Sequence, residues 1–172
     1  MNQEKENHLY QLAIEQLRLS GIKFTVEDLC KVAKVSKKTF YVLYPTKGDF
    51  AKASYRYAFH QYELVAQAYK KNPNKDTLYN LLTWVMDISM IVSEKTFNLY
   101  SMNVLLQEEA NKKKEEIKQD FLSLLKETFK EKITTHPAFF YSLEKTLASL
   151  SHEKEREPLL KDLTEILMPW MR

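Results

Sequence analysis

Apolar residues recur every three or four positions along most of the chain, which is the spacing of one face of an α-helix. The first such stretch, residues 4–19, has its apolar stripe at Leu9, Leu12, Ala13 and Leu17. The same spacing predicts further helices at 26–33, 37–44, 46–69, 76–93, 96–110, 112–134, 137–151 and 157–171. With only two glycines, the chain has little material for tight hairpins, so we expect an all-α protein.

Three predicted helix starts fall ten or eleven residues apart, at Thr25, Ser36 and Thr46. All three are residue types that cap helices, because a side-chain oxygen can accept a hydrogen bond from the first turn. Asp28 and Asp49 follow the two threonines three residues later, where an acidic side chain stabilises a helix start. The caps therefore divide this part of the chain into two short helices before a longer one.

Two short helices joined by a tight turn at Lys34 and braced by a longer first helix are typical of a helix-turn-helix. We therefore expect residues 1–46 to form a three-helix domain of this kind, and residues 47–172 to form a helical bundle. Within the bundle, KKNPNK (70–75) is the best linker candidate. The charge run ANKKKEEIKQ (110–119) predicts a solvated helical face or a kink.

Composition narrows the class of protein further. Cys30 is the only cysteine, which excludes an internal disulfide and a multi-cysteine zinc site. The longest apolar-rich segment, LLTWVMDISMIV (81–92), is shorter than a membrane span and contains Asp87. Without a secretory signal, we expect a cytoplasmic protein that does not enter the membrane.

The positive charge is concentrated in one region. The net charge is only +3, but residues 31–47 hold five lysines and no acidic residue. A local excess of cations is the electrostatic signature of a nucleic-acid contact surface, although a lysine cluster is more often a solvated face. The charge therefore points to the same region as the helix caps.

The segment TVEDLCKVAKVSKKTFYVLYPTKGDF (25–50) resembles the N-terminal signature of TetR-type (tetracycline-repressor-like) transcriptional regulators. The resemblance rests on the capping threonine, the VAKVS step, the TFY run and the PTK that opens the next helix. It implies a homodimer that binds an inverted-repeat operator in double-stranded DNA, and a repressor released when a small-molecule effector enters the larger domain. Two positions that are commonly glycine hold Lys34 and Lys38, and Leu43 replaces a common polar or aromatic residue.

The second short helix has to bury one side and offer the other to DNA. We expect Val35, Phe40, Leu43 and Tyr44 to face the protein. Lysine reaches guanine acceptors or phosphate, a threonine methyl packs on thymine, and a tyrosine hydroxyl donates to phosphate. By these chemistries, together with the helix starts and the resemblance, the candidate DNA contacts are Thr25, Ser36, Lys37, Lys38, Thr39, Tyr41 and Lys47. Ser36 is primarily a helix cap, and any contact with DNA is its secondary role. For each of these residues, the alternative to a DNA contact is an exposed position in contact with solvent only.

The stretch around residues 76–102 suggests an effector pocket, because it is rich in large, adaptable side chains. The candidate lining residues are Asn80, Trp84, Asp87, Met90, Phe97, Tyr100 and Met102. A buried Asp87 needs a partner, and a cationic or hydroxyl-bearing organic molecule would supply one. The alternative is a filled core with Asp87 on a solvent-facing stripe.

The last two predicted helices carry apolar stripes that look wider than a small monomer can bury, so we expect them to form the homodimer interface. The interface candidates are Phe140, Leu143, Leu147, Leu150, Leu163, Ile166, Leu167 and Trp170. No catalytic motif, phosphate loop or metal-binding spacing stands out, so we expect neither an enzyme nor a cofactor. The competing functions are a helical protein-interaction domain and a DNA-binding module without an effector.

Overall fold

Helices form where the sequence has capping residues and apolar residues at helical spacing. The computed structural model describes residues 3–20, 25–99, 103–149 and 156–171. Every element in these ranges is a helix, which confirms the all-α class. They are α1 (Gln3–Ser20), α2 (Val26–Val32), α3 (Lys37–Leu43), α4 (Lys47–Lys71), α5 (Lys75–Ile91), α6 (Glu94–Leu99), α7 (Val104–Thr128), α8 (Lys130–Thr135), α9 (Pro137–Ser149), α10 (Arg156–Leu167) and a 3₁₀ turn (Met168–Trp170). The predicted residues Tyr100, Met102 and Leu150, and the side chain of Leu17, lie outside the described part.

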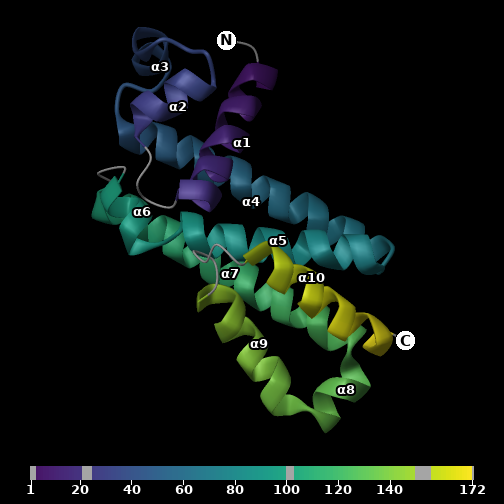
Figure 1. Cartoon of the computed structure of the whole chain (residues 1–172). Helices are drawn as coiled ribbons and strands as arrows, with labels where there is room; N and C mark the ends of the chain where they lie inside the picture. Colours follow the sequence, from purple (N-terminus) through teal and green to yellow (C-terminus); the bar gives the residue numbers. More distant parts are fainter. Residues whose placement is uncertain (1–2, 21–24, 100–102, 150–155, 172) are drawn as a thin grey trace.

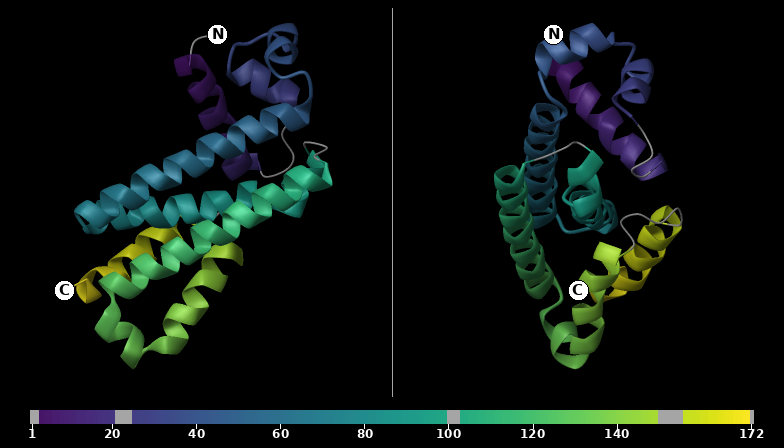
Figure 2. Two further views of the ribbon diagram at one scale, coloured as in Figure 1. Left: turned by 180° about the vertical axis from the view of Figure 1, so that it is seen from behind. Right: turned by 90° about the vertical axis from the view of Figure 1, so that its left-hand side faces the viewer.

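The short helices α2 and α3 lie beside α1 at one end of the molecule, and the long helix α4 leads from them along the rest of the chain (Figure 1). Two further views show α5 and α7 running alongside α4, with α8 and α9 at the end of the molecule opposite to α1, α2 and α3 (Figure 2). The helix α5 contacts α1, α4, α7, α9 and α10, so it is the central helix. Its apolar residues follow most of its circumference, and Leu78, Leu82, Met86 and Met90 are fully buried, as predicted for this stretch.

The helix boundaries differ from prediction in the middle of the chain. We expected a break near residue 111, but α7 continues through the charge run from Val104 to Thr128. Asn103 lies at the start of α7, where its side chain accepts a hydrogen bond from Leu106 N (2.9 Å) and caps the helix. Inside the run, Lys113 and Glu116 form an i,i+3 ion pair that supports the helix. The charge run is therefore a helical face and not a kink.

The predicted dimer stripes are largely covered by their own chain. Both α9 and α10 pack on α5. Five of the predicted interface residues are buried in a single copy: Phe140, Leu143, Leu147, Leu163 and Leu167. The expectation that a small monomer could not bury these stripes was wrong, because the central helix α5 offers an apolar surface on several sides. Of the described interface candidates, Ile166 remains exposed and Trp170 is half-buried beside His136.

Asp87 lies in the interior and is paired. Its side chain is fully buried, and Arg156 Nη2 donates a hydrogen bond of 2.7 Å to Asp87 Oδ1. The prediction that Asp87 lies on a solvent-facing stripe is therefore wrong. The prediction that a ligand supplies the partner of a buried Asp87 is also wrong, because Arg156 is that partner. The arginine comes from the start of α10, so this pair joins α10 to the central helix α5.

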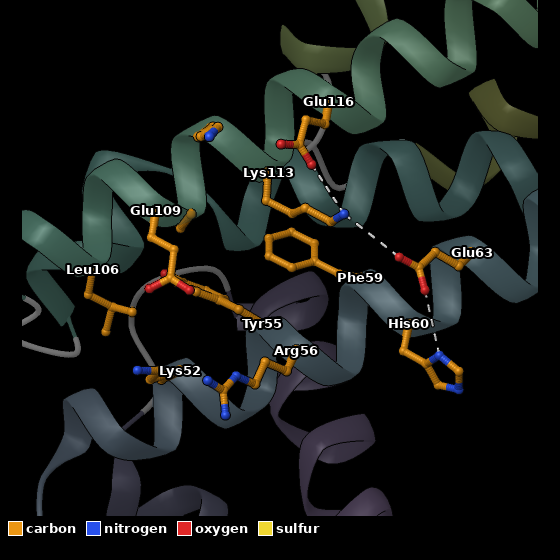
Figure 3. A pocket seen from close by; sticks show the side chains of 12 residues that line it. Lys52, Tyr55, Arg56, Phe59, His60, Glu63, Leu106, Glu109, Lys113 and Glu116 are labelled. Carbon is orange, nitrogen blue, oxygen red and sulfur yellow. Dashed lines mark ion pairs between the residues drawn. The ribbon is translucent and has the colours of Figure 1, made fainter.

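The helices α4 and α7 lie side by side and leave a pocket between them, toward the end that carries α1 (Figure 3). In the ranges that the structure describes, no helix is both long and apolar enough to cross a membrane.

Candidate functional site

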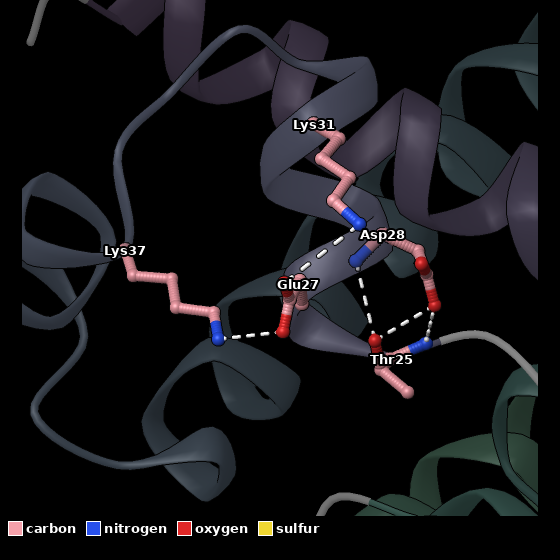
Figure 4. A network of polar contacts seen from close by, with 5 residues as sticks. All are labelled: Thr25, Glu27, Asp28, Lys31 and Lys37. Carbon is pink, nitrogen blue, oxygen red and sulfur yellow. Dashed lines mark hydrogen bonds and ion pairs between the residues drawn. The ribbon is translucent and has the colours of Figure 1, made fainter.

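The start of α2 is held by a capping box formed by the predicted cap Thr25 and by Asp28 (Figure 4). Thr25 Oγ1 accepts a hydrogen bond from Asp28 N (3.2 Å), and Thr25 N donates to Asp28 Oδ2 (2.9 Å). The Thr25 hydroxyl also donates to the same carboxylate oxygen (2.7 Å). These hydrogen bonds, from the hydroxyl first and the backbone second, lower the pKa of Asp28. Thr46 and Asp49 repeat the arrangement at the start of α4.

The turn between α2 and α3 depends on one left-handed residue. Lys34 has φ 53°, and it is the only non-glycine residue with positive φ in the described part of the chain. A lysine in this left-handed conformation costs about 1 kcal/mol relative to glycine. After the turn, the Ser36 hydroxyl accepts a hydrogen bond from Thr39 N (3.0 Å) and caps α3. The turn thereby sets the direction in which α3 leaves α2.

One side of α3 is anchored in an aromatic cluster. Phe40 and Tyr44 are buried, and the centroid of each ring lies 5.1 Å from the ring centroid of Phe50 on α4. The hydroxyls of Tyr44 and Tyr10 share a hydrogen bond of 2.7 Å, which ties α3 to α1. Burial raises the pKa of Tyr44, so its phenol stays neutral. The anchored side fixes which residues the opposite side presents.

The opposite side of α3 faces solvent and carries most of the predicted DNA contacts. Lys37, Lys38, Thr39 and Tyr41 are all exposed, as expected, and we call them, together with Val42, the outer face of α3. Val42 is 73% exposed and was missed from the sequence. Its position four residues after Lys38 was the available signal, because residues four apart share a helical face.

Lys37 is not a solitary cation. Its Nζ lies 2.7 Å from Glu27 Oε2 on α2, and Lys31 approaches the other oxygen of the same carboxylate at 3.7 Å (Figure 4). The hydrogen bond and charge of Lys37 lower the pKa of Glu27, and Glu27 in turn raises the pKa of Lys37. The sequence count of residues 31–47 missed this acid because Glu27 lies just before that window. The outer face of α3 is therefore less positive than the sequence suggests.

The two helix starts differ as candidate phosphate contacts. The oxygen of Thr25 is already bonded to Asp28, whose negative charge stands at the start of α2. At the start of α4, Asp49 occupies the equivalent place beside Thr46, but Lys47 adds an exposed cation at the first helical position. Of the two helix starts, the one with Lys47 is therefore the better candidate for a phosphate contact.

The predicted effector residues occupy different environments. Met90 and Phe97 are buried in the core, Trp84 is half-buried and Asn80 is exposed. The two polar side chains of this set therefore differ: Asp87 is buried and paired with Arg156, whereas Asn80 is exposed.

The pocket between α4 and α7, which has a volume of about 360 Å³, was not predicted from the sequence. It is lined by Lys52, Tyr55, Arg56, Phe59, His60, Glu63, Leu106, Glu109, Ala110, Lys112, Lys113 and Glu116. A signal was present on α4, where cations and aromatic residues alternate at helical spacing from Lys52 to Phe59. The facing wall could not be found in this way, because it comes from a helix some fifty residues later.

Comparison of the chain with protein-family models, with curated proteins and with solved structures finds no match. Across the described residues, no group of three or more histidine, cysteine, aspartate or glutamate side chains is placed to hold a metal ion.

Proposed function

We propose that this protein is a sequence-specific DNA-binding transcriptional regulator of the TetR type, in which α2, the Lys34 turn and α3 form the helix-turn-helix. The observation that carries the proposal is the two-sided character of α3. Phe40 and Tyr44 are buried against α1 and α4, while Lys38 and Tyr41 are exposed on the other side. A short helix that is rigidly anchored and exposes cations suits the major groove of DNA.

Each residue of the outer face has a distinct chemistry toward DNA. Lys38 can donate to guanine acceptors, and the methyl groups of Thr39 and Val42 can pack on thymine methyl groups. Tyr41 on this face and Lys47 at the start of α4 are suited to phosphate contacts, which position the protein without reading sequence. Lys37 can also contact a phosphate, once that phosphate displaces Glu27 from its ion pair with Lys37.

An inverted-repeat operator requires two copies of the chain, so the proposed regulator is a homodimer. Because α9 and α10 already bury most of their apolar residues on α5, the dimer interface would use the apolar side chains of these two helices that remain exposed. Ile166 and Tyr141 are the large apolar side chains exposed on these helices. In the proposed cycle, the dimer represses from its operator and a small-molecule effector releases it.

Selection from a pool of random duplexes at fixed salt tests the proposal. The expected result is enrichment of one inverted-repeat sequence. Lys38→Ala and Thr39→Ala should change the enriched bases, whereas Lys126→Ala, an exposed lysine on α7, should not. If the wild-type chain enriches no sequence, the proposal fails. If it also shows no salt-dependent binding to duplex DNA, a helical protein-interaction domain becomes the better hypothesis.

A further inference from the structure

The pocket between α4 and α7 has an apolar floor. Tyr55 and Ala110 are buried there, and the partly buried side chains of Phe59 and Leu106 complete the surface from the two helices. In the close view, the ring of Phe59 lies between the charged groups of the two helices (Figure 3). A volume of about 360 Å³ is enough for a small organic molecule.

The ion pairs of the pocket lie at one end, and the carboxylate of Glu109 lies at the other end with Lys52 and Arg56 (Figure 3). Lys113 lies between two carboxylates, 3.2 Å from Glu116 and 3.8 Å from Glu63, and His60 Nδ1 lies 3.8 Å from Glu63. At the other end, Lys52 and Arg56 project from α4 (Figure 3). Within the described part of the chain, neither forms an ion pair. The lining as a whole holds four cations, Lys52, Arg56, Lys112 and Lys113, against three carboxylates.

We infer that this pocket binds an organic anion with an apolar body, whose carboxylate or sulfonate meets Arg56 and Lys52. The guanidinium of Arg56 presents parallel N–H donors that match a planar anion, and Lys52 adds a second charge. The body of the ligand covers Phe59 and the apolar floor. The sequence suggested a cationic or hydroxyl-bearing ligand as the partner of Asp87, but Arg156 already pairs with that carboxylate.

The position of the pocket connects it to the proposed DNA surface, and this part of the inference rests on the proposed function. Lys52 and Arg56 lie within the first three turns of α4, the helix that begins at Lys47. A bound anion removes positive charge close to the phosphate contact and thereby lowers affinity for DNA. Because the coupling is reciprocal, DNA lowers affinity for the anion by the same factor.

The first test compares two dyes that share an aromatic body. 1-Anilinonaphthalene-8-sulfonate carries one sulfonate, whereas N-phenyl-1-naphthylamine carries none. Fluorescence titration of the full chain should show one site that binds the sulfonate dye at least tenfold more tightly than the neutral dye. Phe59→Ala should weaken both dyes. Equal affinities of the wild-type chain for the two dyes would overturn the inference.

Charge variants locate the site. Lys52→Gln combined with Arg56→Gln should abolish the preference for the sulfonate dye and leave binding of the neutral dye unchanged. The matched control is Lys126→Gln combined with Lys161→Gln, which removes the same charge from exposed positions outside the pocket lining. Circular dichroism confirms that all variants are folded. An unchanged preference in the pocket variant places the anion elsewhere and contradicts the inference.

A final titration separates the anion site from the proposed function. With a selected duplex, saturating sulfonate dye should weaken DNA binding at least fivefold in the wild-type chain and leave the pocket variant unaffected. Failure to bind any duplex would reject the DNA-binding function while the anion site stands on the dye data. Tight dye and DNA binding without mutual effect would reject the coupling.

Discussion

Lys37 on α3 and Glu27 on α2 face each other across the Lys34 turn, with Nζ 2.7 Å from Oε2. Both side chains are more than half exposed, so water and salt screen the pair and its contribution to stability is small. Its consequence is electrostatic: one of the cations on the outer face of α3 is already balanced by an acid. A DNA phosphate has to compete with Glu27 for Lys37.

We predict that Glu27→Gln strengthens non-specific binding to duplex DNA. Removing the carboxylate releases Lys37 and Lys31 to bind phosphates, so the plot of log affinity against log salt should steepen by about 0.9 for each additional phosphate that a lysine neutralises. Titration of a random-sequence duplex at several salt concentrations measures this slope. Glu131→Gln, on the distant α8, is the matched control. A slope equal to that of the wild-type chain would show that Glu27 does not restrain DNA binding.

Lys47→Ala should weaken binding to every duplex alike and make the salt slope shallower by about one unit, because Lys47 is proposed to contact phosphate and not a base. The enriched sequence in a random-duplex selection should stay the same. Lys71→Ala, at the opposite end of α4, controls for the loss of one charge on that helix. A change of preferred sequence in Lys47→Ala would instead assign this residue to base recognition.

The capping carboxylate of α2 should make stability depend on pH in acid. Thr25 lowers the pKa of Asp28 from its ordinary value of 3.8, so the stabilisation is present above that value and is lost as pH falls through the lower folded pKa. Asp28→Asn should therefore lower Tm at pH 7, and its difference from wild type should shrink as the pH falls below 3.8. Thermal unfolding across this range measures the difference. Asp162→Asn on α10 is the control for losing one carboxylate.

The buried pair between Asp87 and Arg156 should be costly to break from one side. Arg156→Met removes the main countercharge of a buried carboxylate, so we expect a loss of about 3–5 kcal/mol in urea unfolding. Replacing both partners, Asp87→Leu with Arg156→Met, should recover most of this loss because no buried charge remains.

A second ion pair joins the same two helices and provides the control for the buried one. Lys75 on α5 pairs with Glu165 on α10, but both side chains are more than half exposed. Lys75→Met should therefore cost less than about 1 kcal/mol. Equal losses for Arg156→Met and Lys75→Met would mean that burial does not determine the contribution of the Asp87 pair.

Two substitutions distinguish a dimer interface from a core. Leu147 is fully buried, so Leu147→Glu should unfold the chain itself. Ile166 is 49% exposed, so Ile166→Glu should preserve helicity and Tm but yield a monomer in sedimentation velocity at micromolar concentration. If Ile166→Glu remains a dimer, the two copies associate through another surface.

Local signals predicted most of the helices, because caps and periodicity act between residues three or four positions apart. The caps Thr25, Ser36 and Thr46 occur as predicted, and the left-handed Lys34 lies between two helices that were both expected. Two breaks were misplaced: the one expected near residue 111, in the charge run, is absent, and the helix expected over 112–134 instead ends at Thr128, before α8. The helix α7 continues through residue 111, where the ion pairs of Lys113 with Glu116 and of Glu115 with Lys118 each join residues three positions apart in the helix.

The sequence by itself therefore determined the all-α class, the capped short helices and the side of α3 that carries cations. Only the tertiary structure decided what each face meets. Asp87 meets Arg156 sixty-nine residues later, Glu27 meets Lys37 across a turn, and the stripes of α9 and α10 meet α5. The physical reason is that periodicity shows which face of a helix is apolar or charged, whereas the partner of that face depends on how distant helices pack.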